Sequence, residues 1–501
     1  MRADMKILKK ILKWFGISVG AIGLLLGGTY LYLSIDAPPA YVTPGKDLLA
    51  TGTPSLPLPE GDEKETFEPH IAIDPNDPDH LVTAAMMGDR FGRGGRNLHR
   101  WTSRDGGKTW QGHKVKALAF QDNFAADTVI AFDDKSRDHM LAMFGDRPFP
   151  KDPVILHMML QFSQLVGKLL GRPLSPEEEE PRGGGVAMSI GDPVTGKLGA
   201  PFRVTPVPER NADKTWLAID NSPASPYRGN VYSVWSESST LTKLDIAMTT
   251  TKAGTAVGTI NVPVVDQESS SYWPSISTRP NGRVDLVWFD ETKQIVQHRY
   301  SDDGGKSFSK IANITAERKG VRVDSPAITT APDGTVMTCW VESTEKLAVR
   351  TKCATTRNDE DWSAAVDIDT AISPKGMIGQ PAVAASATGL WVLAYKTDKQ
   401  TDVVLYRSVD GGKSFSPYQV LASRSFGVEK VCIGLAHDTP CRYQPAVGRF
   451  SGGGDYIGLS AVGNRVAAVF GLTLGNDPVQ FATNYVKVID VPTTVDSTRQ
   501  K

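Results

Sequence analysis

Short runs of alternating apolar and polar residues recur along most of this chain. Val284–Trp288 and Thr335–Trp340 are typical, and each follows an opening segment that contains a proline. Alternation with a period of two is the pattern of a β-strand that buries one face. Similar opening segments occur near residues 68, 127, 214, 273, 325, 380 and 455. The pattern therefore predicts an all-β protein built from repeated units.

One turn sequence, Ser-x-Asp-x-Gly-x-x-aromatic, occurs three times. Its defining positions are Ser103, Asp105, Gly107, Trp110, then Ser301, Asp303, Gly305, Phe308, and finally Ser408, Asp410, Gly412, Phe415. The second and third copies begin 107 residues apart, which fits two units of about 54. A period near 50 with four strands per unit predicts a β-propeller. We count seven blades; six is the alternative, if the last segment only completes the first blade.

The N-terminal residues differ from the rest, because lysines are followed there by an apolar run. Residues 14–35 contain no charge, and their 22 positions match the ~20 that a helix needs to cross a membrane. The basic segment 1–13 orients this end toward the cytoplasm. A cleaved signal peptide is the alternative, but its apolar region would be only ~7–15 residues. We expect a signal anchor, a proline-rich linker at 36–66, a propeller at 67–490 and a tail at 491–501.

Residues 146–182 interrupt the repeat within its second unit. Within them, Val154–Leu170 should form a helix that is apolar on most of its surface. This helix is short for a membrane span. It either packs on the propeller itself or contacts the membrane surface or a protein partner, since methionine-containing apolar helices make adaptable contacts.

The repeated turn resembles the Asp-box, or BNR repeat, of sialidase-like β-propellers. The stretches Asp213–Pro223 and Gly454–Leu459 look like bacterial proteins described as exo-α-sialidases. The resemblance extends from about residue 66 to residue 490 and implies a propeller of four-stranded blades. It does not fix the function, since similar propellers include sialidases, other glycosidases, sorting receptors and assembly factors.

The resemblance also implies catalytic residues that can be compared with this sequence. A sialidase of this kind would clamp the substrate carboxylate with three arginines, and it would use a tyrosine nucleophile, a glutamate and an aspartate acid/base. Thr66–Pro69 stands where the first arginine is expected, and its Glu68 would repel a carboxylate. Arg322 and Arg442 lie near other strand openings without matching the pattern. If the protein is an enzyme, we therefore expect a divergent active site, whose catalytic residues the sequence does not assign.

The opening ends of the inner strands should converge at the centre of a propeller. Their mixture of acidic and aromatic side chains suits a neutral sugar or a peptide. The predicted ligand-binding residues are Glu68, Asp127, Lys214, Trp216, Tyr272, Trp273, Asp324, Gln380, Arg322 and Arg442. The alternative for each is a structural role at a strand end or in the channel.

The cysteines, the charged residues and the histidines indicate which covalent links and which ligand classes to expect. The four cysteines form two pairs that are close in sequence, Cys339 with Cys353 and Cys432 with Cys441, and export permits disulfides; four free thiols are the alternative. Basic and acidic residues number 55 and 56, so nothing suggests a nucleic-acid surface. The eight histidines have no ligand-like spacing, and we expect neither a metal nor a cofactor.

These features predict a single-pass membrane protein whose propeller is periplasmic or at the cell surface. We expect a sialidase-like module that binds a glycan or a protein. The alternative is a glycoside hydrolase, exo-α-sialidase-like, with a divergent active site. The expected partners are the membrane, through residues 14–35, and a glycan ligand. The helix at Val154–Leu170 would hold any protein partner or contact the membrane surface.

Overall fold

The regular elements of the structure are β-strands, in the part of the chain that it describes, and this confirms the all-β class. The computed structural model describes residues 48–57, 63–89, 94–115, 125–145, 184–205, 212–240, 243–255, 260–264, 270–344, 349–358, 361–374, 376–398, 400–424, 428–432, 441–445, 456–472 and 483–492. Within these ranges, no helix has the length and apolar character needed to cross a bilayer. The predicted anchor at 14–35 and the predicted helix at Val154–Leu170 lie outside them.

The first four sheets follow one another along the chain, and each contains four antiparallel strands. Their strands are β2 (Glu63–Ile73), β3 (Leu81–Asp89), β4 (Gly94–Ser103) and β5 (Gln111–Val115), then β6 (Ala125–Phe132), β7 (Asp138–Gly145), β8 (Gly184–Ile190) and β9 (Phe202–Arg203), then β10 (Ala212–Ile219), β11 (Asn230–Thr240), β12 (Lys243–Lys252) and β13 (Ile260–Pro263), and finally β14 (Ser271–Thr278), β15 (Val284–Asp290), β16 (Ile295–Ser301) and β17 (Ala312–Asn313). The alternation of the sequence thus appears as consecutive hairpins.

The C-terminal half continues the series with small variations. Its strands are β18 (Val321–Thr330), β19 (Val336–Thr344), β20 (Val349–Thr356) and β21 (Val366–Asp367), then β22 (Met377–Ser386), β23 (Gly389–Thr397), β24 (Thr401–Ser408) and β25 (Ser416–Arg424) with β1 (Leu48–Leu49) at its edge, then the hairpin β26 (Val428–Cys432) and β27 (Cys441–Pro445), and finally β28 (Gly458–Val462), β29 (Arg465–Leu472) and β30 (Thr483–Asp490). One parallel pairing, between β20 and β22, joins two of these sheets.

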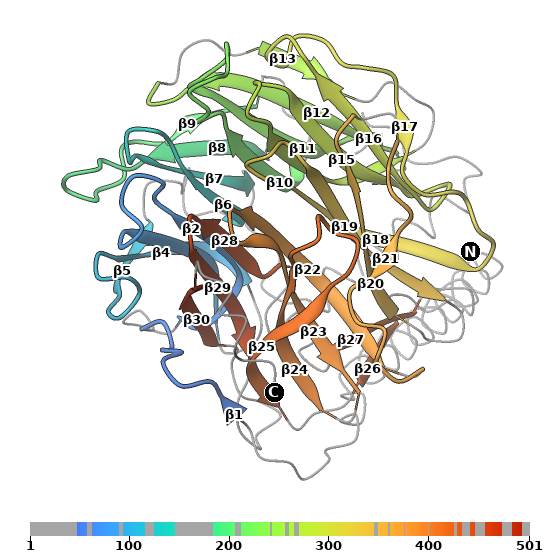
Figure 1. The fold of residues 1–501 in the computed structure, drawn as a ribbon. Helices are drawn as coiled ribbons and strands as arrows, with labels where there is room; N and C mark the ends of the chain where they lie inside the picture. The colour runs from blue at the N-terminus through green and yellow to red at the C-terminus, as the bar shows by residue number, and fades with distance from the viewer. Residues whose placement is uncertain are drawn as a thin grey trace, which may run out of the picture.

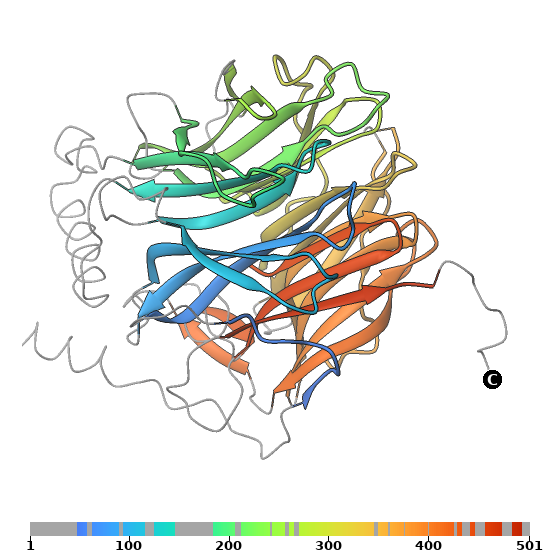
Figure 2. The ribbon, with the colours of Figure 1, turned by 90° about the vertical axis from the view of Figure 1, so that its left-hand side faces the viewer.

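The first strands of successive sheets lie side by side around a common centre (Figure 1). In the described part of the chain, β2, β6, β10, β14, β18, β22 and β28 are neighbours in this order, and β28 returns to β2. The hydrophobic core fills the spaces between the faces of adjacent sheets. In one such layer, Ile246 and Met248 of β12 pack with Leu286 and Trp288 of β15. Figure 2 shows the same stacked sheets from the side.

The three repeated turns share one hydrogen-bond network, and each joins the third and fourth strands of its sheet. In the first turn, the Ser103 hydroxyl donates to Asp105 Oδ1 over 2.8 Å and accepts from the Gly107 N–H over 2.9 Å. The Asp105 carboxylate also accepts from the Thr109 N–H and hydroxyl. The other two turns repeat these bonds from Asp303 and Asp410. In each turn two consecutive glycines have φ between 72° and 87°, a region that glycine adopts without strain.

This network predicts a loss of stability in acid. Burial opposes ionisation at Asp303 and Asp410, but the hydrogen bonds of the turn outweigh it and hold the pKa of each carboxyl at about 2. Bonds from Thr109 do the same for the pKa of Asp105. A folded-state pKa below the ordinary 3.8 stabilises the protein above that pH and stops doing so as the pH falls toward 2. We expect the urea midpoint to fall over this pH interval, and to fall less in an Asp105→Asn, Asp303→Asn, Asp410→Asn triple variant. An equal fall in the original chain and in the variant would contradict a stabilising role of these carboxylates.

Residues 48–57 form a strap along the outside of the body, although the sequence predicted a linker there. Leu48 and Leu49 pair with β25 as β1, and Ser55 forms a β-bridge with Tyr485 of β30. The strap also bonds to the first sheet, since the Trp101 indole N–H donates to the Pro57 carbonyl over 2.9 Å. It therefore links the last two sheets of the series to the first one and helps to close the ring.

The strap should contribute measurably to stability. Leu56 is only 2% exposed and packs with Ile71, Trp101 and Val469, whereas Leu49 is 38% exposed. We expect Leu56→Ala to lower the free energy of unfolding by about 2–4 kcal/mol, because it leaves a cavity between the first sheet and the last one. Leu49→Ala is the matched control and should change it by less than ~0.5 kcal/mol. Urea unfolding of the full chain in mild detergent distinguishes these values, and equal small effects would show that the strap is only loosely held.

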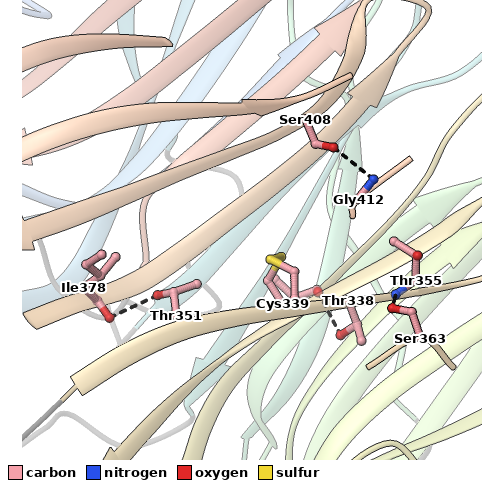
Figure 3. Close-up of a disulfide and its surroundings, with 10 residues drawn as sticks. Thr338, Cys339, Thr351, Thr355, Ser363, Ile378, Ser408 and Gly412 are labelled. Atoms are coloured by element: carbon pink, nitrogen blue, oxygen red, sulfur yellow. Dashed lines mark hydrogen bonds between the residues drawn. A yellow bond between two sulfur atoms is a disulfide. The ribbon is translucent and has the colours of Figure 1, made fainter. Parts of the chain in front are cut away.

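The structure confirms the predicted disulfide between Cys339 and Cys353 (Figure 3). The two residues face each other on β19 and β20, where Cys339 is the register partner of Cys353. Both side chains are buried against the next sheet, near Val392 and Tyr406. Cys432 and Cys441 are likewise register partners, on β26 and β27, but their side chains lie outside the described residues, so that pairing stays a prediction.

Candidate functional site

Six inner strands share a backbone irregularity near their first residues. At each one the antiparallel register shifts, and a non-glycine residue adopts a φ between 49° and 59°. These residues are Glu68, Asp127, Lys214, Trp273, Ser325 and Gln380. A positive φ is uncommon outside glycine, and a β-bulge re-aims the side chains beside it. Proline follows four of the six, and its missing N–H suits a position where the ladder is interrupted.

Two of these bulge residues, Asp127 and Lys214, meet in a buried ion pair. Lys214 donates its backbone N–H to Asp127 Oδ2 over 2.7 Å, and its ammonium lies 3.9 Å from the same oxygen. Both residues are almost fully buried, as is Glu68. The ion pair joins the second sheet to the third, and Glu68 belongs to the first.

Asp127 carries a strongly perturbed carboxyl group. Burial raises the pKa of Asp127 well above its usual range; the Lys214 ammonium opposes this rise, and the carboxylates of Glu68 and Asp213 reinforce it. A hydrogen bond between the side chains of Glu68 and Asp127 also favours the protonated form. The net effect favours the protonated form of Asp127 beside the Glu68 carboxyl.

Aromatic rings enclose the Lys214 ammonium. Its Nζ lies 4.8 Å from the ring centroid of Trp273 and 4.9 Å from that of Tyr456, within the range of cation–π attraction. The two rings are themselves 5.4 Å apart. The Tyr456 hydroxyl is buried and has no hydrogen-bond partner among the described residues. Burial raises the pKa of Tyr456 well above its usual value, and the carboxyl of Asp127 adds to this rise.

Partly exposed side chains lie beside this buried group. Asp213 accepts the Lys214 N–H over 2.9 Å with one oxygen and the Tyr272 hydroxyl over 2.6 Å with the other. Trp216 is also partly exposed and makes an edge contact with His70, with ring centroids 5.3 Å apart. His70 Nδ1 lies 3.2 Å from the Ile130 N–H, and burial lowers the pKa of His70 to about 4, so this ring is neutral near pH 7.

The predicted site residues are thus only partly brought together. Six of them contact one another directly or through a shared partner, namely Glu68, Asp127, Lys214, Trp216, Tyr272 and Trp273. Gln380 occupies a bulge position in its own sheet, while Asp324 precedes the bulge and accepts the Ser325 N–H over 2.8 Å. Arg322 is exposed on β18, and the Arg442 side chain lies outside the described residues.

Sequence reasoning missed two residues of this group, Asp213 and Tyr456, and also His70, which contacts Trp216. Asp213 directly precedes Lys214, and the equivalent positions in two other sheets are Tyr272 and Asp324. Tyr456 stands just before β28 in the last unit, where a match to the other strand openings would have pointed to it. A tyrosine, a glutamate and an aspartate therefore lie together here, and the cation among them is a lysine.

The chemistry available here is that of carboxyl, ammonium, phenol and indole groups. Within the described ranges, no three His, Cys, Asp or Glu side chains are placed to hold a metal ion. We refer below to Glu68, Asp127, Asp213, Lys214, Trp216, Tyr272, Trp273 and Tyr456 as the central cluster.

Comparisons with known proteins find similarity only at the level of structure. No protein-family model matches the chain, and no curated protein matches its sequence significantly. A protein of unknown function from Dyadobacter fermentans is 12% identical, with a TM-score of 0.46 over 88% of this chain and 100% of that one. An ulvan lyase of polysaccharide lyase family PL25 is 9% identical, with a TM-score of 0.47 over 86% and 95%. The intramolecular trans-sialidase of Ruminococcus gnavus is 12% identical, with a TM-score of 0.41 over 90% and 97%.

Sialidases and a polysaccharide lyase are thus among the similar solved structures. The three TM-scores quoted are below 0.5 and the identities do not exceed 12%. The function of this chain is therefore argued from its own residues.

Proposed function

We propose that this protein is a membrane-anchored, seven-bladed propeller that binds a neutral glycan at the central cluster. The observation that carries the proposal is the buried Glu68–Asp127–Lys214 group with aromatic rings around it. Strongly perturbed ionisable groups with specific charged partners are typical of functional sites. The ring of inner strands supports the blade count, and the uncharged run at 14–35 supports the anchor.

The charges of the cluster favour a neutral ligand over an anionic one. Three carboxyl groups, Glu68, Asp127 and Asp213, surround a single ammonium, so a ligand carboxylate would meet more repulsion than attraction. Carboxylates accept hydrogen bonds from sugar hydroxyls, and indole or phenol rings offer apolar faces to a pyranose ring. Asp213, Tyr272 and Trp216 combine these features and keep part of their surface exposed.

Cleavage of the bound glycan is a second candidate, favoured by the raised pKa of the Asp127 carboxyl. A carboxyl group whose pKa is raised by burial is suited to act as a general acid. Glu68 cannot be its opposed carboxylate, because the two are in hydrogen-bond contact, whereas two-carboxylate glycosidases need separations of about 5 Å or more. Hydrolysis at this site would need another nucleophile, and the Tyr456 phenol is the candidate. Glu68 would have to accept its proton during the attack, because burial raises the pKa of this phenol well above its usual value.

The test is a glycan array probed with the full chain in mild detergent, together with a panel of fluorogenic glycosides that includes sialosides. We expect neutral glycans to bind, and Asp213→Asn and Tyr272→Phe each to weaken binding about ten-fold through loss of a hydrogen bond to a charged group. Asp302→Asn, a surface carboxylate in an ion pair with Arg283, is the matched control. Binding that survives both site changes would disprove this location. Turnover of a neutral glycoside would establish the second candidate.

A further inference from the structure

Exposed apolar side chains gather at one edge of the molecule. Among the described residues, five large hydrophobic side chains are exposed, and four belong to the edge formed by β1, β24 and β25 or to the turn between β24 and β25. These four are Leu49, Val409, Tyr418 and Val420. The fifth, Val194, lies in a different sheet, in the turn after β8. A local group of this kind differs from the single exposed apolar residues that are normal on soluble surfaces.

The N-terminal segment of the chain joins the propeller at this same edge. Leu48 and Leu49 pair with Ser423 and Ala422 of β25, and the Ala50 N–H donates to the Leu421 carbonyl over 2.9 Å. Figure 1 shows β1 beside β25 at the periphery. Residues 36–47 separate the proposed anchor from β1, and twelve residues span at most ~40 Å when fully extended. The edge that carries β1 is therefore held within this distance of the bilayer.

The side chains of the edge suit the boundary between lipid and water. Tyr418 contacts Trp391 edge-on, with ring centroids 5.1 Å apart, and the Arg407 guanidinium lies 5.8 Å from the Tyr418 ring centroid. Tyrosine is favoured at membrane interfaces, because one end of its side chain is apolar and the other is polar. Lys413 is exposed in the neighbouring turn and can approach anionic headgroups.

We infer that this edge, with Leu49, Tyr418 and Val420 at its centre, rests on the bilayer that holds the anchor. The inference rests on the proposed anchor at 14–35. Docking at the edge would fix the orientation of the propeller, so that β1 and β25 face the lipid. Since the central cluster lies at the inner ends of the strands, its side of the propeller would stay open to ligands in the aqueous phase.

The test is a spin label at Val420→Cys in the full chain, reconstituted into vesicles that contain anionic lipid. Unsubstituted protein, carried through the same labelling, measures the background from the native cysteines. Val194→Cys is the matched control, because it places the label on an exposed valine of another sheet. We expect the label at 420 to relax faster with oxygen, which concentrates in lipid, than with a water-soluble nickel chelate, and we expect the label at 194 to show the reverse.

Flotation of the same vesicles separates the failure of this inference from failure of the anchor. A chain that floats with the vesicles while the label at 420 is accessible to the nickel chelate retains the anchor and overturns the docking. A chain that remains at the bottom of the gradient overturns both. Leu49→Ser with Val420→Ser should leave flotation intact and make a label at Tyr418→Cys accessible to the chelate; an unchanged oxygen preference in that variant would also contradict docking by these side chains.

Discussion

Replacing Lys214 by methionine should lower the free energy of unfolding by about 3–5 kcal/mol, because it removes the buried cation that faces Asp127. The ammonium lies within reach of Asp127 and against two aromatic rings, and no solvent can replace it at this depth. Without it, the buried carboxyl groups of Glu68 and Asp127 would remain together beside the partly exposed Asp213. Methionine preserves most of the side-chain volume, so the change reports charge rather than a cavity.

Lys293→Met is the control for this prediction. Its ammonium is 3.8 Å from Asp290, a separation similar to that of Lys214 from Asp127, but the Lys293 side chain is 51% exposed. The Asp290 carboxyl is buried, but water reaches the Lys293 ammonium, so the pair should contribute only ~1 kcal/mol and this variant should unfold almost as the original chain does. Adding Asp127→Asn to Lys214→Met should recover part of the loss, since it removes one of the unpaired carboxyl groups. If Lys214→Met lowered the free energy of unfolding as little as Lys293→Met does, the buried carboxyl groups would not need the Lys214 ammonium for stability.

Asp138→Ala is the second change expected to have a large effect, again about 3–5 kcal/mol, because it leaves the Arg100 guanidinium buried without its counter-charge. Asp138 accepts two hydrogen bonds from Arg100, of 2.7 and 2.8 Å, and only about 1% of its surface is exposed. The pair joins β4 of the first sheet to β7 of the second, and these two sheets also contribute Glu68 and Asp127. The third Arg100 donor binds the Gly196 carbonyl over 2.9 Å.

The same bidentate arrangement occurs on the surface and provides the comparison. Arg283 donates to both oxygens of Asp302 over 2.6 and 3.0 Å, but the Asp302 side chain is 57% exposed. Asp302→Ala should therefore cost less than ~1 kcal/mol. Calorimetry of both variants in the same detergent measures the difference. A mild effect at Asp138 would mean that the first two sheets are held together by apolar packing alone.

The fold could be predicted from the sequence because each repeated unit is built from residues that are close together in the chain. Each hairpin shows its alternation within about ten residues, and the three turns show their glycines and aspartates within eight. The disulfide was predictable for the same reason, since its cysteines lie on consecutive strands of one sheet. The strap was not, because residues 48–57 bind mainly through backbone groups and proline carbonyls, which leave no side-chain pattern in the sequence.

The candidate site was predictable only as far as the strand openings could be aligned. That alignment correctly grouped Glu68, Asp127, Lys214 and Trp273, whose positive φ values recur at equivalent positions. The partners that define its chemistry come from elsewhere: Tyr456 is 242 residues after Lys214 in sequence, yet their side chains are in contact. The sequence also could not show that Glu68 and Asp127 are hydrogen-bonded or that the pKa of Asp127 is raised, since both depend on burial and distance and not on residue type.

Hydrogen–deuterium exchange of the full chain, with and without a neutral oligosaccharide that binds on the array, tests most directly whether the central cluster is the binding site. The predicted result is protection of peptides that cover β6, β10 and β14, the strands that carry Asp127, Lys214 and Tyr272. Asp213→Asn should reduce this protection at the same ligand concentration. Protection confined to the outer strands, or unchanged exchange in β10 while the glycan is bound, would contradict a glycan site at the centre of the propeller.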